Sequence, residues 1–258
     1  MIKKILKKII SYTNYELVSK TDIIKLKTEI FKKKLDGTSL TKDKSIEGFL
    51  AHISLNKEKT FSQIFQDLFV DFMLSKSAGF FCEVGACDGI VHSNTFWLEK
   101  KRNWTGILCE PSIQWHNKLK LNRPRSIVVK EPIFSLSNEE LDFVEIKGGR
   151  SFLNYKNKNV NFDDDKKKVK LNTICLNDLF KKNNVNEIDY LSLDTEGSEY
   201  DILQSIDFKL YAPKIITIEH NYAPIKRKQI FKLMTKEGYK RYFPFISRFD
   251  DWYVKETK

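Results

Sequence analysis

The chain opens with apolar residues at helical spacing. Within residues 2–10 isoleucine and leucine recur every three or four positions with lysines between them, which predicts a basic amphipathic helix. A second helical pattern covers residues 21–35 and ends at Asp36 and Gly37. A basic amphipathic helix packs against its own protein, against a partner, or on a membrane surface. We therefore expect residues 1–35 to be the part of the chain that contacts a partner or a membrane.

From Thr60 onward, short apolar runs alternate with helical segments. A helix is expected from Phe61 to Met73, and the main strands are expected at residues 80–84, 105–109, 126–130, 190–193 and 215–218. An extra strand pair is expected at residues 141–146 and 169–174, and a terminal antiparallel hairpin at residues 239–243 and 250–254. This alternation predicts an α/β fold with a mostly parallel sheet flanked by helices. The predicted organisation is a helical extension over residues 1–59 and one domain over residues 60–258.

The composition of the chain bears on its cellular location and on the distribution of its charge. Lysines interrupt the apolar residues at the N-terminus, and no apolar run approaches the about 20 residues of a membrane span. We therefore expect a cytoplasmic protein, with association to the inner face of a membrane left open. The net charge is +11, and residues 1–60 hold 14 lysines against 7 acidic residues, which leaves +4 for residues 61–258. The four cysteines lack metal-site spacing and are expected to be reduced thiols.

The first strand of the predicted domain ends in an acid and a glycine-containing turn. Glu83 closes the strand, and Gly85 and Gly89 punctuate the turn. Open α/β sheets bind ligands at this edge, where Gly85 would let the backbone approach a ligand and Glu83 would meet the ammonium of a bound amino acid. A dinucleotide enzyme would have a third glycine, and the flanking acids would repel a pyrophosphate.

Glu110 ends the second strand, 21 residues after Gly89. An acid at this position accepts both hydrogen bonds of a ribose diol. Either Glu83 or Glu110 alone could be a solvent-facing or helix-capping residue. The two acids together, at this spacing, favour a cofactor that contains adenosine.

A third acidic group, Asp194, Glu196 and Glu199, follows the fourth main strand. Asp194 would meet the ammonium of the cofactor or a substrate hydroxyl, and Glu196 is a second catalytic candidate. Glu199 is equally well explained as a cap of the next helix. Three acids also permit a divalent cation, but no further ligand pattern accompanies them, and the prediction is that no metal is bound. His220 ends the fifth strand and is the candidate general base, with a structural histidine as the alternative.

Taken in order and spacing, these motifs resemble those of the FkbM-type methyltransferase family, a group within the Rossmann-like, S-adenosylmethionine-dependent methyltransferases. The resemblance is carried by Ser62–Asp67, Glu83–Gly89, Ser93–Thr95 with Leu98 and Glu99, Trp104–Gly106 with Glu110 and Pro111, and Asp194–Glu199. It implies a seven-stranded sheet, S-adenosylmethionine as the methyl donor, and O-methylation of sugars or other hydroxylated metabolites. Residues 1–59 fall outside it.

The resemblance also implies roles for single residues. Glu83 and Gly85 would face the methionine part of the cofactor, Glu110 its ribose, and Ile133, after Pro132, its adenine. The remaining expected cofactor contacts are Ala86, Asp88, Gly89, Asn94, Pro111 and Asp194.

Three functions remain open from the sequence. The first is an enzyme that methylates a hydroxyl of a sugar, glycan or glycan precursor. The second is a nucleic-acid methyltransferase or nucleic-acid-binding protein, which we do not expect, because the excess positive charge lies outside the domain and no series of stacking aromatic residues is evident. The third is an inactive, membrane-associated scaffold. The acceptor and the oligomeric state are not predicted, and the loop at residues 148–161 carries no recognisable motif.

Overall fold

The computed structural model describes residues 44–156 and 162–256. The helices predicted within residues 2–10 and 21–35 lie outside this part of the chain. The described residues form two compact units, residues 44–60 with 68–75 and residues 61–67 with 76–256. The domain boundary predicted after residue 59 stays a prediction. Among the described helices, none is long and apolar enough to cross a membrane.

The smaller unit is built on the helices α3 (Ile46–Asn56) and α4 (Gln66–Leu74), with a short 3-10 helix, η1 (Lys57–Lys59), after α3. The side chain of Ser45 caps α3 by accepting a hydrogen bond from the backbone N–H of Gly48 at 3.2 Å. The ring of Phe49 then packs against Phe69 and Phe72, with centroid separations of 5.8 and 5.5 Å. The apolar side of α4 is therefore covered within this unit by α3.

The predicted start of α4 at Phe61 is wrong by five residues. Residues before Gln66 form a turn, because Asp67 accepts hydrogen bonds from the Phe61 N–H and the Ser62 hydroxyl, and Phe65 has a left-handed φ of 71°. Side chains that bond to nearby backbone groups compete with helix formation in this way.

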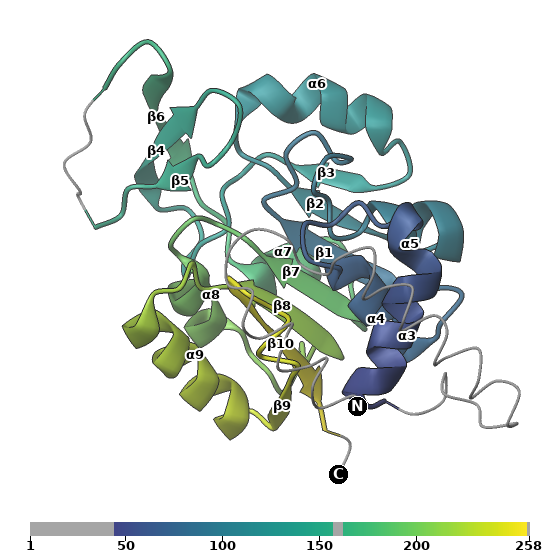
Figure 1. The fold of residues 1–258 in the computed structure, drawn as a ribbon. Coiled ribbons are helices and arrows are strands. Elements are labelled where there is room, and N and C mark those ends of the chain that lie inside the picture. The colour runs from purple at the N-terminus through teal and green to yellow at the C-terminus, as the bar shows by residue number, and fades with distance from the viewer. Residues whose placement is uncertain (1–43, 157–161, 257–258) are drawn as a thin grey trace, which may run out of the picture. The chain divides into compact units, whose positions relative to one another are not determined.

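A seven-stranded sheet forms the centre of the larger unit, in the order β3-β2-β1-β7-β8-β10-β9 (Figure 1). Its strands are β1 (Phe80–Val84), β2 (Thr105–Cys109), β3 (Ile127–Val129), β7 (Tyr190–Leu193), β8 (Ile215–Glu219), β9 (Tyr239–Tyr242) and β10 (Asp250–Lys255). The first five strands in this order pair in parallel, and β10 runs antiparallel to both β8 and β9. The predicted fold class, a mostly parallel sheet with a terminal antiparallel hairpin, is confirmed.

Helices connect the strands and cover the sheet. They are α5 (Phe96–Arg102), α6 (Ile113–Asn122), α7 (Leu176–Lys182), α8 (Glu199–Ser205) and α9 (Pro224–Lys236). On one face of the sheet, apolar strand residues such as Val84 and Ile216 share a buried core with Leu179 of α7, Ile202 of α8 and Met234 of α9. The central strands read as continuous apolar runs because they are buried on both faces.

The strand order reverses beside β1. The chain leaves β1 for β2 and β3 on one side and later returns to β7 and β8 on the other. At such a switch point the connections diverge and leave a crevice outside the carboxyl ends of the strands, which is where open α/β sheets bind ligands. The ends of β1 and β7 flank this point in the structure.

A second, three-stranded antiparallel sheet precedes α7, in the order β5-β4-β6, and stands apart from the main sheet at the upper left of Figure 1. Its strands are β4 (Glu140–Ile146), β5 (Phe152–Leu153) and β6 (Lys166–Asn172). It has its own small core of Phe134, Phe143 and Leu153. The extra strand pair expected here is confirmed, although β6 begins three residues earlier than expected, in the exposed lysines that hid its pattern.

Candidate active site

Gly85 begins the turn after β1 with a φ of +91°. Its backbone N–H donates to the carbonyl of Cys109 at 2.9 Å, and a Cβ at this position would lie 2.1 Å from the carbonyl oxygen of Asp194. Only glycine fits, because the chain leaving β7 passes directly against it. The sequence attributed this glycine to the approach of a ligand, whereas the backbone of Asp194 by itself requires it.

Gly89 closes the same turn for a similar reason. A Cβ here would lie 2.6 Å from the Leu119 side chain and 2.7 Å from that of Arg123, both of which belong to α6 or its C-terminal cap. Asp88 contributes to the turn through its own carboxylate, which accepts hydrogen bonds from the N–H groups of Ile90 and Val91, both at 2.9 Å. These contacts define the shape of the turn before any ligand binds.

Ala86 is buried, and its N–H donates to the carbonyl of Cys109 at 3.2 Å. Pro111, two residues after Cys109, is half-buried. Both lie beside the carboxyl ends of β1 and β2, where the sequence predicted cofactor contacts. Their roles as contacts stay predictions.

Glu110 links the turn after β1 to the start of α6. Its carboxylate accepts one hydrogen bond from the N–H of Cys87 and another from the N–H of Ser112, both at 2.8 Å. The side chain is buried, and this burial raises the pKa of Glu110 to about 7, with a further contribution from the nearby charge of Glu145. Each carboxylate oxygen still has a lone pair for another donor. The group therefore lies at the end of β2 with capacity to accept two hydroxyls.

The carboxylate of Glu83 faces the loop that follows the turn. It accepts hydrogen bonds from the Asn94 N–H at 2.6 Å, the Ser93 hydroxyl at 2.9 Å and the Thr95 hydroxyl at 2.5 Å. Burial raises the pKa of Glu83, and the charge of Arg123 opposes this shift. The carboxylate therefore holds the loop in place, and the contact to a cofactor ammonium remains a prediction.

Asn94 ties this loop to β7 and leaves one acceptor over. Its side-chain N–H donates to the Ser192 hydroxyl at 2.9 Å, while its buried Oδ1 has no partner among the described residues. Buried polar atoms are rarely left unpaired, so a donor from outside the described chain is expected here. An ammonium group or another N–H donor of a ligand at the ends of β1 and β7 fits this requirement.

Ile133 lies in the segment that follows β3. Its side chain is 3% exposed and lies in the apolar core of the main sheet. The backbone around it forms a parallel bridge with Ile174, which joins the segment after β3 to the one before α7. The predicted contact of Ile133 with an adenine ring stays a prediction.

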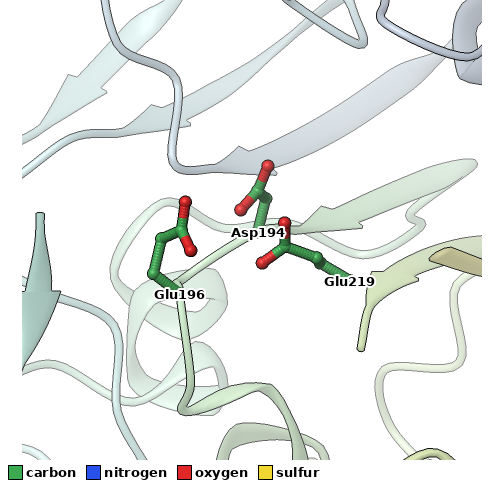
Figure 2. A group of neighbouring side chains, drawn as sticks. All are labelled: Asp194, Glu196 and Glu219. Atoms are coloured by element: carbon green, nitrogen blue, oxygen red, sulfur yellow. The ribbon is translucent and has the colours of Figure 1, made fainter. Parts of the chain in front are cut away.

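Three carboxylates converge where β7 and β8 end, as Figure 2 shows. Asp194, Glu196 and Glu219 each offer one oxygen, and these oxygens lie within 4.8 Å of one another. The register explains the meeting: Leu193 pairs with Ile218, so the next residue of each chain, Asp194 and Glu219, follows side by side. Glu219 was not predicted as a site residue. It lies at the end of a strand, and the same kind of position was the signal by which Asp194 was predicted.

This carboxylate cluster retains protons at neutral pH. Burial, together with the charges of Asp194 and Glu196, raises the pKa of Glu219 to about 10. Burial and the neighbouring acids also raise the pKa of Asp194 well above its usual value. Asp250 lies directly across from Glu219 in the sheet, accepts a hydrogen bond from Gln66 at 2.9 Å, and has a pKa that burial raises to about 7. Like charges this close favour the protonated form of some members.

Asn221 joins two members of the cluster. Its side-chain N–H donates to Glu219 at 2.7 Å and to Glu196 at 3.2 Å. Three residues here have left-handed backbones: Glu196, Asn221 and Tyr222, with φ of 57°, 48° and 57°. Unfavourable backbone conformations of this kind concentrate at functional sites. Asn221 was not among the site residues predicted from the sequence.

Glu199 stabilises the turn that presents Asp194 and Glu196. Its carboxylate accepts hydrogen bonds from the N–H groups of Thr195 at 2.9 Å and Gly197 at 3.0 Å, and it pairs with Lys226 at 2.7 Å. These contacts favour a structural role for Glu199 over a direct role in the chemistry of the site.

His220 lies apart from the cluster. His220 directly follows β8, and its backbone N–H donates to the carbonyl of Phe249 at 2.8 Å. The His220 side chain is fully buried, its Nδ1 accepts a hydrogen bond from the N–H of Tyr222 at 3.0 Å, and its Nε2 lies 4.0 Å from Asp251. Burial also lowers its pKa. This position argues against His220 as the general base and favours the structural alternative.

The same cluster has the chemistry of a hard-cation site. Oxygen ligands from Asp194, Glu196 and Glu219 are the type that magnesium and calcium prefer. The absence of a metal therefore stays a prediction.

The second sheet is anchored at two sides of this edge. The side-chain amide of Gln114, in α6, donates to the carbonyl of Ile146 at 2.8 Å. The hydroxyl of Tyr155 donates to Asp201 at 2.5 Å and to the carbonyl of Gly197 at 3.3 Å. The hairpin between these anchors therefore extends from the end of β2 to the turn after β7. Residues 157–161, which complete the loop at residues 148–161, lie outside the described residues.

The sequence match to known families agrees with this geometry. The methyltransferase FkbM domain family matches residues 83–249, from Glu83 in β1 to the residue before β10. The chain belongs to the FkbM methyltransferase family. Among proteins with curated descriptions, no match was found.

Several solved structures are similar in fold to this FkbM-family protein. One is the methyltransferase FkbM from Methylobacillus flagellatus, with 12% identity, 83% of this chain and 56% of that one covered, and a TM-score of 0.49. The O-methyltransferase from Bacillus cereus in complex with SAH, S-adenosylhomocysteine, has 12% identity, coverage of 99% and 100%, and a TM-score of 0.41. The fibrillarin pre-rRNA processing protein of Methanococcus jannaschii has 13% identity, coverage of 71% and 69%, and a TM-score of 0.39.

The family match and the mostly parallel seven-stranded sheet identify the protein as an S-adenosylmethionine-dependent methyltransferase with a Rossmann-like fold. S-adenosylmethionine is its cofactor. The unpartnered Oδ1 of Asn94 and the accepting carboxylate of Glu110, at the ends of neighbouring strands, fit a ligand that has both an ammonium and a ribose.

Proposed function

We propose that this FkbM-family protein transfers a methyl group to a hydroxyl of a neutral sugar, glycan or glycan precursor. The observation that carries the proposal is the cluster of Asp194, Glu196 and Glu219, with oxygens within 4.8 Å of one another and raised pKa values. A hydroxyl must lose its proton when it accepts a methyl group. A carboxylate whose pKa is raised towards neutrality is a better base for that proton than an ordinary one.

The chain's own residues would divide the work as follows. Glu110 would accept the ribose hydroxyls and Asn94 the ammonium, with the turn at residues 85–89 lying between them. Bound S-adenosylmethionine supplies a methyl group on a positively charged sulfur. The acceptor oxygen would attack the methyl carbon as the carbon–sulfur bond breaks. Glu196 or Asp194 would take the proton that the acceptor hydroxyl loses, whereas Glu219, with a pKa of about 10, is already protonated at neutral pH and would donate a hydrogen bond. Because the displacement requires alignment, positioning by these residues would account for most of the rate.

The charge of the cluster bears on the acceptor class. Several carboxylates at one strand edge repel a phosphate-rich acceptor, although the charges of Arg150 and Lys226 act on Glu196 in the opposite sense. Neutral hydroxyl-rich acceptors carry no such penalty. This supports a sugar or glycan acceptor over nucleic acid.

The proposal is tested by incubating the full chain with S-adenosylmethionine that carries a radioactive methyl group and with separate pools of neutral glycans, sugar nucleotides and RNA. Label is expected in the neutral glycan pool, as a methyl ether. Asp194→Asn and Glu196→Gln should each lower turnover by about 100-fold or more with the donor still bound. Glu187→Gln, the same change at an exposed site beyond the opposite edge of the sheet, is the matched control and should leave turnover unchanged.

Two results would contradict the proposal. Label in RNA alone would assign the protein to the nucleic-acid alternative. Cofactor binding with no transfer to any pool, in protein that is folded, would favour the inactive scaffold.

A further inference from the structure

Arg123 is the C-terminal cap of α6 and has a fully buried side chain, with 0% exposure. Buried arginines are rare, because the guanidinium must replace the hydrogen bonds it loses to water. Neither the family motifs nor the proposed chemistry accounts for this residue.

The guanidinium donates its hydrogen bonds to the loop at residues 89–95 and to the carboxylate of Glu99. Its Nε donates to Glu99 at 2.6 Å. Its Nη1 donates to the carbonyl of Gly89 at 3.0 Å and to the Ser93 hydroxyl at 3.2 Å, and its Nη2 donates to the Thr95 hydroxyl at 2.9 Å. One rigid, planar group therefore holds both ends of the loop at residues 89–95.

The same loop carries the donors that orient Glu83. Ser93 and Thr95 accept from Arg123 and donate in turn to the Glu83 carboxylate, which lies 3.9 Å from the guanidinium. Asn94, between them, presents the unpartnered Oδ1. A change at Arg123 would therefore shift the groups at the end of β1 without touching a ligand itself.

We infer that Arg123 is a positioning residue for cofactor binding, which fixes the loop at residues 89–95 and through it Glu83 and Asn94. The inference rests on the proposed placement of the cofactor at the ends of β1 and β2. It does not depend on the identity of the methyl acceptor.

The test is a calorimetric titration of the full-length protein with S-adenosylhomocysteine, together with hydrogen exchange of the loop amides. Arg123→Lys keeps the positive charge but loses the planar guanidinium with its fixed N–H donors. It should weaken the affinity for S-adenosylhomocysteine by about 10-fold to 100-fold. Exchange should rise at residues 89–95 and stay unchanged in β7 and β8. Raised KM for the methyl donor, with a smaller change in kcat at saturation, is expected from the same variant.

Two further variants separate positioning from stability. Thr95→Val removes a loop contact while leaving the Arg123–Glu99 ion pair in place, and should weaken affinity in the same way even if Arg123→Lys folds poorly. Arg125→Met is the matched control: this half-exposed arginine bonds to Asn103 and the Glu99 carbonyl, and its loss should leave affinity unchanged.

A Glu110→Ala arm distinguishes the two ways of failing. If Glu110→Ala weakens binding while folded Arg123→Lys and Thr95→Val bind as tightly as wild type, the inference is refuted by itself. If Glu110→Ala also binds unchanged, the placement of the cofactor is wrong and the inference falls with it.

Discussion

Replacing Glu219 by glutamine should stabilise the cofactor-free protein, and more so as the pH rises. In the folded chain, burial and the neighbouring acids raise the pKa of Glu219 to about 10, from an ordinary 4.5. A group with a raised folded-state pKa contributes stability below its unfolded pKa and loses it as the pH rises towards the folded value. Wild-type folding at neutral pH must therefore take up a proton that glutamine does not need.

The magnitude follows from the pH interval. Each unit above the unfolded pKa costs about 1.4 kcal/mol until the folded pKa is reached. Between pH 5 and pH 7, the advantage of Glu219→Gln in free energy of unfolding should grow by about 3 kcal/mol. The side chain is 6% exposed, so solvent screening reduces this little.

Urea unfolding of wild type and Glu219→Gln at pH 5 and pH 7, without cofactor, measures the difference. Glu187→Gln, at an exposed ion-paired position, is the control and should change the free energy by less than about 0.5 kcal/mol at either pH. An advantage for Glu219→Gln that is the same at both pH values would refute the electrostatic reasoning. So would a variant that is less stable at pH 7 than at pH 5 relative to wild type.

Other predictions concern the turn, the histidine and the N-terminal region. Gly85→Ala should lower the free energy of unfolding in urea by about 2 kcal/mol or more, because φ is positive and the new Cβ would lie 2.1 Å from the Asp194 carbonyl oxygen. Gly197→Ala should cost less, because a Cβ there meets open space although φ is also positive. Equal losses would contradict this reasoning. His220→Gln should lower turnover by less than about 10-fold, and a loss of about 100-fold with the donor still bound would restore it as the base. Removal of residues 1–43 should leave the affinity for S-adenosylhomocysteine unchanged. Removal of residues 1–59 should lower the melting temperature, because it uncovers Phe69 and Phe72. Equal melting temperatures of the two truncated proteins would show that α3 adds no stability.

The sheet was predictable because burial leaves a strong pattern. Strands such as Phe80–Val84 and Tyr190–Leu193 are continuous apolar runs bounded by polar turns, and the structure has them at the predicted residues. The start of α4 was not predictable from periodicity, because the side chains of Gln66 and Asp67 bond to the preceding backbone. Local hydrogen bonds of this kind compete with helix formation and leave no periodic signal.

The site was predictable only as far as its edge. Strand ends locate Glu83, Glu110 and Asp194 correctly, since parallel strands present their carboxyl ends together. Glu219 and His220 are neighbours in the sequence, yet Glu219 joins the carboxylate cluster whereas His220 is buried 4.0 Å from Asp251. Contacts between distant segments, such as Gly85 against the carbonyl of Asp194, leave no trace in local sequence.

A titration with S-adenosylhomocysteine tests the central claim, that the cofactor binds at the carboxyl ends of β1 and β2. Wild type should bind one equivalent. Glu110→Ala should lose about 1.5 to 3 kcal/mol of binding free energy, because a charged acceptor of two hydroxyls is removed. Affinity should also fall as the pH drops below about 7, where Glu110 takes up a proton. Saturable binding that is equally tight in Glu110→Ala, or no binding to folded wild type, would contradict the account.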